Sequence, residues 1–447
     1  MKASDVHAQI SKYLPAWGEP IVVDIEGSQG AYLRDALTGK DYIDFFTYFA
    51  SAPIGHNHPK MHDSAFIEKL LSVAITKPSS SDFFTTYMAE FVETFARLAM
   101  PTDMKHLFLI SGGALAVENG LKVAFDWKVR KNFQRIAKPA SNGHLHRIEG
   151  LGSKVIHFRD AFHGRSGYTM SMTNTDDERK YLYFPKFEWP RILNPKLRFP
   201  ITKEVLADVQ HAEEIAIAQI ESAVRQFPGD IAALILEPIQ GEGGDNHFRP
   251  EFFKELRRLA DEHEFLFIVD EIQSGMGITG KWWAIEHMGV KPDIIVFGKK
   301  AQVCGIIVGP RIDDVEDNVF AQESRINSTW GGDLTDMVRS QRFLEILHEE
   351  NLLENAAKMG KRLLTGLQSV ADSSKGFVTN VRGLGLMAAF DVPDKAARDA
   401  LQERLKENGL YALKSGARSI RFRGMLDTPA DIIDKTIKIV EKSLPKG

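Results

Sequence analysis

The chain has 447 residues, of which 43% are hydrophobic and 26% are charged, so it can bury a large core divided over two domains. Its formal net charge is −4 and its basic and acidic residues are interleaved, which makes nucleic acid and anionic membrane surfaces poor candidate partners. The single cysteine, Cys304, excludes an intrachain disulfide and a cluster held by cysteines.

The N-terminal segment carries no signal-peptide pattern. The sequence MKASDVHAQISKYLPAW lacks an apolar stretch of that kind, and no run in the chain approaches the roughly 18 apolar residues of a membrane-spanning helix. We therefore expect a cytoplasmic protein. Residues 30–45 come next, and their alternating pattern with turn signals predicts a small antiparallel hairpin.

The middle of the chain alternates short apolar runs with long amphipathic segments. Helices are expected over residues 114–131 and 250–263 and after Asp333. This alternation indicates an α/β domain with a mainly parallel sheet. Continuous apolar runs predict strands buried on both faces at residues 107–110, 232–237, 265–271 and 293–298.

The two chain ends are expected to form a smaller α+β domain together. The C-terminal part begins with a long helix and ends in the strand-like segments 381–392 and 419–424. We place the N-terminal part of this domain at residues 1–75, the large domain at 76–334 and the C-terminal part at 335–447. Residues 176–199 are rich in aromatics and prolines without a clear period, and we interpret them as an ordered surface insertion.

The expected strand ends carry residues suited to binding an anion. Open α/β sheets bind ligands at the carboxyl ends of their strands. Residues 111–114, Ser-Gly-Gly-Ala, stand between a strand and a helix, where backbone N–H groups and the helix N-terminus can hold a phosphate. A purely structural Gly-Gly turn is the alternative interpretation.

Ionisable residues end the other strands. Asp270 needs a partner at the end of so apolar a run, and a protonated ring nitrogen would serve, although it could equally cap the next helix. An amine of the pair Lys299-Lys300 could have a lowered pKa and form a Schiff base, whereas most lysine pairs are simply solvated. Glu237 ends another run and Glu242 follows in a Gly-rich turn, where acids are usually loop residues. The joint order of these groups, more than any one of them, indicates a site.

Nearly the whole chain resembles the class III, or ω-, aminotransferases, which use pyridoxal 5′-phosphate (PLP). The segment DEIQSG, with a lysine about 30 residues later, is highly specific for this family. The resemblance implies a fold-type I α/β architecture, with a large PLP-binding domain on a mainly parallel seven-stranded sheet and a smaller α+β domain. The motifs that carry it, in family order, are GAYLRDALTGKDYIDF, PIGHNHP, FHGR, EPIQGEGG, DEIQSGMGITGK, PDIIVFGKK, NSTWGG, VRGLGL and SIRF.

The resemblance also implies residue roles at the cofactor. Lys300 would be the Schiff-base lysine, chosen over Lys299 for its spacing to Gly305, and Asp270 would face the pyridine nitrogen. Ala114 stands where the family usually has a hydroxyl residue. The other implied cofactor contacts are Gln273 at the phenolic oxygen, Phe162 stacked on the ring, Gly113 and Ala114 at the phosphate, Glu237, and Thr329 offered to the partner subunit's phosphate in a homodimer.

Two arginines are implied as substrate ligands. Arg165 would take the distal carboxylate of either substrate, and Arg421 the carboxylate next to the reacting carbon of the oxo acid. Glu242 would pair with Arg421 while an amine without that carboxylate reacts, and would then swing away. Asn327 and Ser328 would add polar contacts. A surface ion pair for Arg165 and a strand-edge charge for Arg421 are the structural alternatives.

Within the family, the segments GGALAVEN, FHGR and GKKAQVCG most resemble the lysine 6-aminotransferases. This likeness implies transfer of the ε-amino group of L-lysine to 2-oxoglutarate. The products would be L-glutamate and 2-aminoadipate 6-semialdehyde, which cyclises to piperideine-6-carboxylate. A 4-aminobutyrate, ornithine or diamine donor, an aminomutase reaction and a PLP-binding regulatory module remain alternatives. No metal, nucleic-acid or membrane partner is expected.

Overall fold

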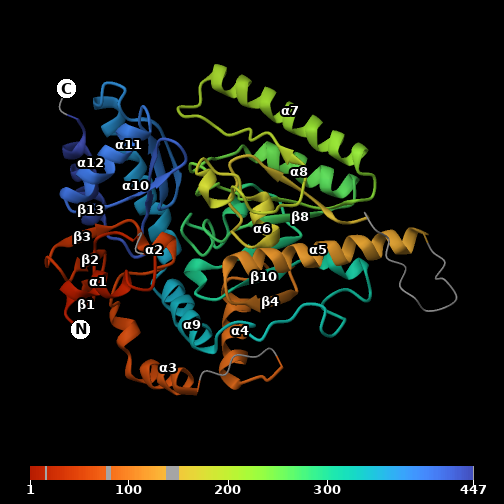
Figure 1. The fold of residues 1–447 in the computed structure, drawn as a ribbon, viewed down its shortest axis with the longest axis horizontal. Helices are drawn as coiled ribbons and strands as arrows, with labels where there is room; N and C mark the ends of the chain where they lie inside the picture. Colours follow the sequence, from red (N-terminus) through yellow and green to blue (C-terminus); the bar gives the residue numbers. More distant parts are fainter. Residues whose placement is uncertain (16–17, 77–81, 137–150, 446–447) are drawn as a thin grey trace.

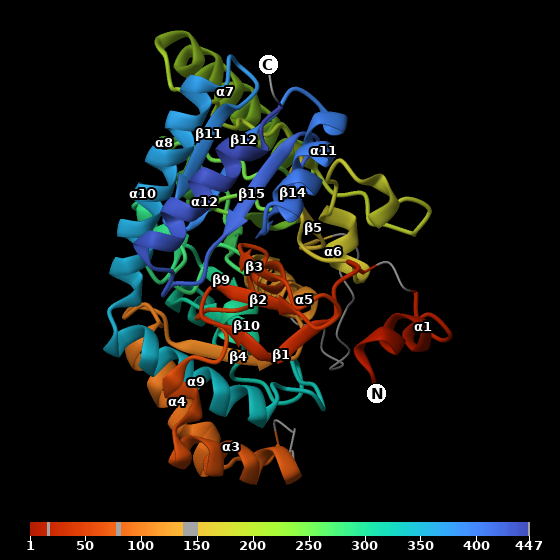
Figure 2. The same cartoon turned by 90° about the vertical axis from the view of Figure 1, so that its left-hand side faces the viewer.

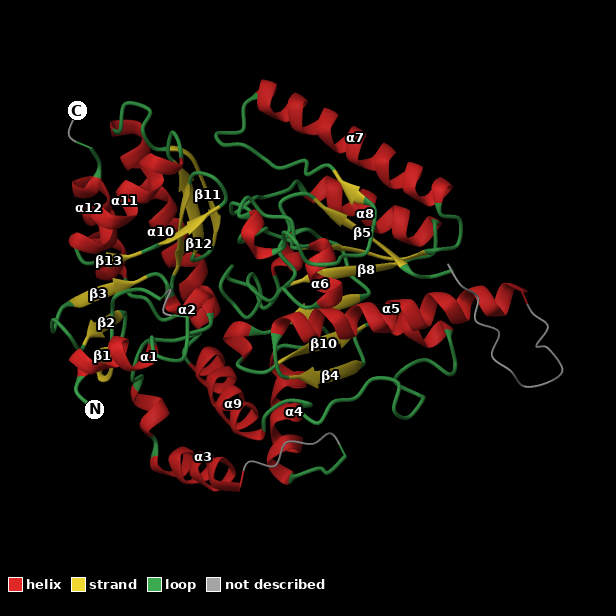
Figure 3. Cartoon of the chain, viewed as in Figure 1, coloured by secondary structure: helices red, strands yellow, loops and turns green. Residues whose placement is uncertain are grey.

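The computed structural model describes residues 1–15, 18–76, 82–136 and 151–445. Its main feature is a large central sheet with helices on both faces, beside two smaller sheets built from the chain ends (Figures 1 and 3). Within the described residues, no helix is both long and apolar enough to cross a membrane, and no cluster of three or more potential metal ligands is found.

The central sheet has seven strands, as the family resemblance implies. Strand β10 runs antiparallel to both of its neighbours, β4 and β9, while the pairs from β9 to β6 are parallel. All four strands expected from the sequence are present, and each of their ends differs by at most one residue from the expected bound. The spatial order is β4 (His106–Ile110), β10 (Cys304–Val308), β9 (Ile294–Phe297), β8 (Leu266–Asp270), β7 (Ile231–Leu236), β5 (Lys154–Phe158) and β6 (Arg191–Ile192).

Successive residues of the central strands point to opposite faces of the sheet. In β7, Leu234 and Leu236 join a core that includes residues of α4 (Thr86–Leu98) and α8 (Pro250–Glu262). Ala233 and Ile235 join a second core with residues of α5 (Gly113–Ile136). Figure 1 shows α5 on one side of the sheet and α7 (Lys203–Gln226) with α8 on the other. Burial on both faces is why these strands have continuous apolar sequences.

Two of the expected helices begin at residues that suit a helix N-terminus, where the first backbone N–H groups have no partner within the helix. The carboxylate of Asp333 accepts a hydrogen bond from the N–H of Thr335 at 2.8 Å, at the start of α9 (Leu334–Glu349). Pro250 occupies the first position of α8, where no intrahelical hydrogen bond is lost. The remaining helices of the N-terminal half are α1 (Val6–Ile10), α2 (Thr47–Ala50), α3 (Ser64–Thr76) and α6 (Gly167–Met172).

Residues from both chain ends contribute to one hydrophobic core. The hairpin of β2 (Tyr32–Asp35) and β3 (Asp41–Asp44) is antiparallel, and the C-terminal strand β13 (Leu410–Tyr411) extends it in parallel to β3. Figure 2 shows the second small sheet beside this one. It consists of β11 (Thr379–Leu384), β12 (Met387–Asp391), β15 (Ser419–Arg423) and β14 (Leu413–Ser415), and packs with α10 (Leu352–Ser373), α11 (Lys395–Glu407) and α12 (Ala430–Ser443).

The aromatic segment 176–199 lies between α6 and α7 and is joined to the edge of the central sheet. It contains the short 3-10 helix η3 (Glu178–Lys180) and supplies the edge strand β6, which pairs with β5. The rings of Phe187 and Trp189 stack at a centroid distance of 5.3 Å. The segment therefore carries η3 on a backbone that is tied to the sheet.

Candidate active site

The carboxyl ends of β4, β5, β7, β8 and β9 meet at one edge of the sheet. They line a cavity of about 500 Å³, which we call the inner cavity. Side-chain and backbone groups from segments far apart in the sequence converge there because parallel strands end on the same side. Of the residues expected at the cofactor, the cavity brings together Gly113, Ala114, Phe162, Glu237, Asp270 and Gln273.

Asp270 is the buried acid at the centre of this edge, with 4% of its surface exposed. Its Oδ2 lies 2.8 Å from Nδ1 of His163, and its Oδ1 accepts a hydrogen bond from the N–H of Ile272 at 3.1 Å. The sequence reasoning did not single out His163, although it belongs to the FHGR motif. The pairing holds the carboxylate in one orientation at the cavity wall.

Glu237, which follows the neighbouring strand β7, fixes the backbone next to Asp270. Its two oxygens accept hydrogen bonds from the N–H groups of Phe162 and Gly241, each at 2.9 Å. Burial raises the pKa of Glu237 to about 7, the charge of Asp270 acts in the same direction, and His163 opposes it. Glu237 therefore ties the chain that carries the Phe162 ring to the end of β7.

The turn between β4 and α5 has the geometry of an anion cradle. Gly112 has a φ of +109°, which side-chain-bearing residues rarely adopt, and Gly113 is the first residue of α5. The N-terminal N–H groups of this long helix face the cavity side of the turn. A Cβ atom on Gly164 would lie 2.7 Å from Cβ of Ala114, so the wall beside the turn admits only small residues.

The two adjacent lysines at the end of β9 point in different directions. Lys299 lines the inner cavity, and burial lowers its pKa to about 8, helped by the charges of Arg421 and Arg423. Lys300 is 2% exposed and does not line this cavity, because its Nζ donates to the carbonyl oxygens of Gln273 at 2.7 Å and Ala50 at 3.4 Å. The amine of Lys300, the lysine expected from its spacing to Gly305, is therefore turned away from the inner cavity, and Lys299 is the lysine that faces it.

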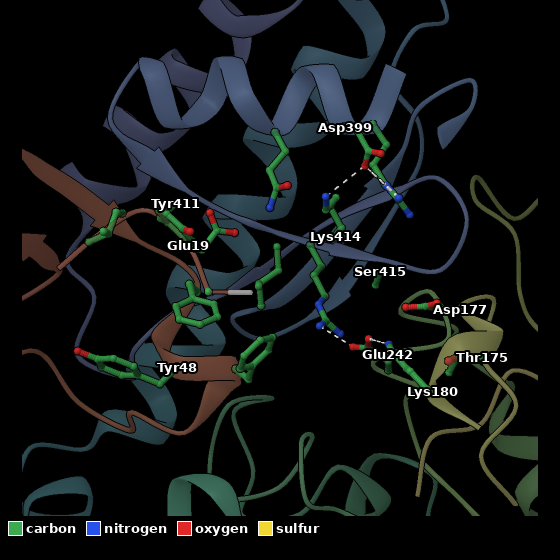
Figure 4. Close-up of a pocket in the computed structure, with 18 of the residues that line it drawn as sticks. Glu19, Tyr48, Thr175, Asp177, Lys180, Glu242, Asp399, Tyr411, Lys414 and Ser415 are labelled. Atoms are coloured by element: carbon green, nitrogen blue, oxygen red, sulfur yellow. Dashed lines mark hydrogen bonds and ion pairs between the residues drawn. The ribbon is translucent and has the colours of Figure 1, made fainter. Parts of the chain in front are cut away.

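A second, outer cavity of about 1040 Å³ contains the expected switch pair. Nη2 of Arg421 donates to Oε2 of Glu242 at 2.8 Å, while Lys180 donates to the other oxygen, Oε1. Figure 4 shows the carboxylate of Glu242 between two nitrogen-bearing side chains, one of them Lys180. Lys180 gave no signal in the sequence, because it stands in the segment without a period.

The charges of this cluster are strongly coupled. Burial alone would raise the pKa of Glu242, but the charges of Arg421 and Lys180 outweigh it and lower the value to about 2. Arg421 is 2% exposed, and its Nε and Nη1 have no hydrogen-bond partner among the residues that the structure describes. Buried guanidinium donors without partners are costly, so this arginine is prepared for a further acceptor.

Gln273 connects the inner cavity to the second small sheet. Its Oε1 accepts two hydrogen bonds from Arg423, at 2.7 and 3.0 Å. Its Nε2 is therefore the side-chain atom that can donate towards a ligand. Arg423 in turn forms an ion pair with Asp245, so the cavity wall is braced by a buried charge pair.

Other expected site residues lie outside both cavities in the single chain. Arg165, Asn327 and Thr329 are exposed, and Ser328 is half-buried. The segment that carries Thr329 nevertheless lies beside the cradle turn, because the N–H of Ser111 donates to the carbonyl of Trp330 at 3.0 Å. The geometry of one chain leaves the roles of these four residues as predictions.

Comparison with known proteins gives consistent results over almost the whole length. The family profile Aminotransferase class-III matches residues 13–444. The L-lysine-epsilon aminotransferase of Mycobacterium tuberculosis is 46% identical over 441 residues, covering 98% of this chain and 95% of that protein. The enzyme of that name from Streptomyces clavuligerus is 44% identical over 446 residues, covering 99% and 95%. The solved lysine aminotransferase from M. tuberculosis in the internal aldimine form aligns with a TM-score of 0.94 and 46% identity, covering 100% and 99% of the two chains.

Proposed function

Because the chain belongs to the class-III aminotransferases, we propose that it transfers the ε-amino group of L-lysine to 2-oxoglutarate. The products are L-glutamate and 2-aminoadipate 6-semialdehyde, which cyclises to piperideine-6-carboxylate. The observation that carries the proposal is the ion pair between the buried Arg421 and the half-buried Glu242. The likeness to L-lysine-epsilon aminotransferases at 44% to 46% identity supports lysine as the donor.

The family, together with the internal aldimine form of the solved M. tuberculosis enzyme, implies PLP as the cofactor, and the inner cavity fits it. The turn at Gly112 and Gly113 offers backbone N–H groups to a phosphate, and Asp270 offers a carboxylate to a protonated ring nitrogen. Phe162 is the aromatic ring on the cavity wall. Bound PLP supplies an electron sink for negative charge at the reacting carbon of the substrate.

We assign the covalent bond to the cofactor to Nζ of Lys299. Its lowered pKa, about 8, leaves part of the amine unprotonated and nucleophilic near neutral pH. When it is not bonded to the cofactor, the amine of Lys299 would act as a general base and acid towards the reacting carbon of the substrate. His163 holds the carboxylate of Asp270 in one orientation through the 2.8 Å contact between Nδ1 and Oδ2, and this carboxylate would pair with the ring nitrogen of the cofactor.

The pair of Arg421 and Glu242 explains how one site accepts two different substrates. An ε-amine sits on a carbon without a carboxylate, so Glu242 neutralises Arg421 during that half-reaction. The oxo acid has a carboxylate on its reacting carbon, which takes Arg421 in a charge-assisted contact as Glu242 leaves. Arg165 is proposed for the distal carboxylate, and Asn327 and Ser328 for further polar contacts.

A donor screen tests this proposal. Cofactor-loaded enzyme is incubated with 2-oxoglutarate and L-lysine, 4-aminobutyrate, L-ornithine or a diamine, and glutamate formation is followed for each. We expect kcat/KM for lysine to exceed the others by about tenfold or more, since a substrate that fills a polar site is strongly preferred. The product from lysine is identified by mass as the cyclic imine. If the enzyme turned over 4-aminobutyrate but not lysine, the proposed donor would be wrong, while the proposed aminotransferase activity would stand.

A further inference from the structure

The carboxylate of Glu242 is shared between two cations that come from different parts of the fold. Arg421 on β15 donates to Oε2 at 2.8 Å, and Lys180 at the end of η3 donates to Oε1. Each cation therefore has its own carboxylate oxygen. Breaking the contact with Arg421 does not by itself require breaking the contact with Lys180.

A carboxylate that leaves Arg421 needs somewhere to go. The side chain of Glu242 is only 25% exposed, so solvent cannot hydrate it fully when its arginine is taken by a substrate. An ion in such surroundings without a partner is expensive, and this cost would weaken binding of the oxo acid. Lys180, whose side chain is 23% exposed, lines the outer cavity together with Glu242 and Arg421 and is the second cation on the carboxylate.

The position of Lys180 is held by its surroundings. Its Nζ lies 5.7 Å from the centroid of the Phe162 ring, and the N–H of Leu182 donates to the carbonyl of Glu178 at 2.8 Å across the turn of η3. The neighbouring Arg179 pairs with Asp177 at 2.7 Å, so that nearby acid already has a cation of its own.

We propose that Lys180 is a specificity-determining residue that keeps Glu242 paired while Arg421 binds the carboxylate of the oxo acid. The proposal rests on the function proposed above and names a further residue of the same switch. In the amine half-reaction Glu242 bridges both cations, and in the oxo-acid half-reaction it remains on Lys180 alone. Lys180 thus lowers the cost of the step that admits a substrate with a carboxylate on its reacting carbon.

A double-mutant cycle on ligand binding tests the proposal without turnover. Binding of glutarate, an unreactive dicarboxylate, to the cofactor-loaded enzyme is measured by calorimetry for wild type, Lys180→Met, Glu242→Gln and the double variant. We expect Lys180→Met to weaken binding about five- to tenfold in the wild-type background, and by less than about twofold when Glu242 is already Gln. Lys180→Arg should restore binding, and Lys196→Met, which removes an ion pair with Asp160 from the same segment, should not change it.

The half-reactions give a second readout. In single turnovers, Lys180→Met should lower the rate constant with 2-oxoglutarate about as much as it weakens glutarate binding, and leave that with lysine within about twofold. Equal loss of glutarate binding in both backgrounds would show that Lys180 contacts the ligand or acts by charge alone, and would overturn the proposal. No loss in either background would overturn it as well. If wild-type enzyme turns over neither lysine nor 2-oxoglutarate, the proposed function fails instead, and that result is independent of the cycle.

Discussion

At the scale of single residues, the two lysines after β9 show that the direction of a side chain decides whether it reaches the site. They are neighbours on the 3-10 turn η5 (Lys299–Ala301), so their side chains leave the backbone at different angles. Lys299 meets the cavity, whereas the amine of Lys300 is held by two backbone carbonyls. Spacing along the sequence cannot decide which of two adjacent lysines faces the cavity, because this depends on the path of the backbone through the turn.

We predict that Lys299→Ala abolishes turnover and the absorbance band of the covalently bound cofactor, because no other amine of the turn faces the inner cavity. Lys300→Met is the matched comparison and should retain the band, with reduced thermal stability from the lost contacts to Gln273 and Ala50. Absorbance spectra of the purified variants after PLP addition decide between them. A band retained in Lys299→Ala and lost in Lys300→Met would restore the assignment made from spacing.

Residues that follow a recognisable strand could be predicted from the sequence pattern without the family resemblance. Asp270, Glu237 and Gly113 each follow an apolar run, and the edge of a parallel sheet gathers such positions. His163 and Lys180 could not be predicted in this way. Their roles depend on which acid each reaches across the cavity, and that is set by the course of irregular segments without a period.

At the scale of elements, the antiparallel strand β10 controls the spacing between the cradle turn and Lys299. It lies between β4 and β9, and Gly305 pairs with Leu109 on one side and Phe297 on the other. The alternation of strands and helices predicted the parallel part of the sheet. It did not predict β10 as an antiparallel strand, because the chain returns through the short 3-10 turn η5 without an intervening α-helix.

Gly305→Ala tests this coupling. A Cβ atom there would collide with the backbone carbonyl of Phe108 and lie 2.8 Å from Cζ of Phe297, so the backbone ladder between β4 and β10 and the ring of Phe297 must shift. We expect a loss of about 1–3 kcal/mol in stability, as for overpacked cores, together with weaker PLP binding. Thermal unfolding and PLP titration measure the two effects. Gly167→Ala, whose Cβ would meet only Oε1 of Glu118 at 3.9 Å, is the control. If Gly305→Ala were destabilised but bound PLP with unchanged affinity, the packing of β10 would not control the cofactor site.

At the scale of the whole molecule, exposed apolar side chains predict a homodimer. Ile75 on α3 is 76% exposed, and Phe83 and Phe84 after it are each 81% exposed, which is unusual for a monomer. We expect a mass near twice 50.1 kDa by light scattering, and mostly monomer for Phe84→Asp, with weaker PLP binding because Thr329 is proposed to reach the partner. Ile201→Asp, two residues before α7, a helix that lies far from α3 in Figure 1, should remain dimeric. A fully active monomeric wild type would contradict the prediction.

The stability of the whole chain should also depend on a buried acid next to the site. Burial raises the pKa of Glu271 from 4.5 to about 7, with Asp270 adding to the rise and the hydrogen bonds from Ser274 and Ile285 opposing it. A carboxyl that holds its proton more tightly when folded favours the folded state at low pH. That contribution is lost as the pH rises from about 4.5 to about 7.

Glu271→Gln removes this titration and can keep both contacts, because its amide oxygen can accept from the N–H of Ile285 and its amide nitrogen can donate to Ser274. We expect the variant to match wild type near pH 4.5 and to gain on it as the pH rises, by on the order of 1–3 kcal/mol above pH 7. Thermal midpoints measured from pH 4.5 to 8 give the difference. The exposed Glu255→Gln should run parallel to wild type, and a parallel curve for Glu271→Gln as well would mean that Glu271 is ionised throughout this range.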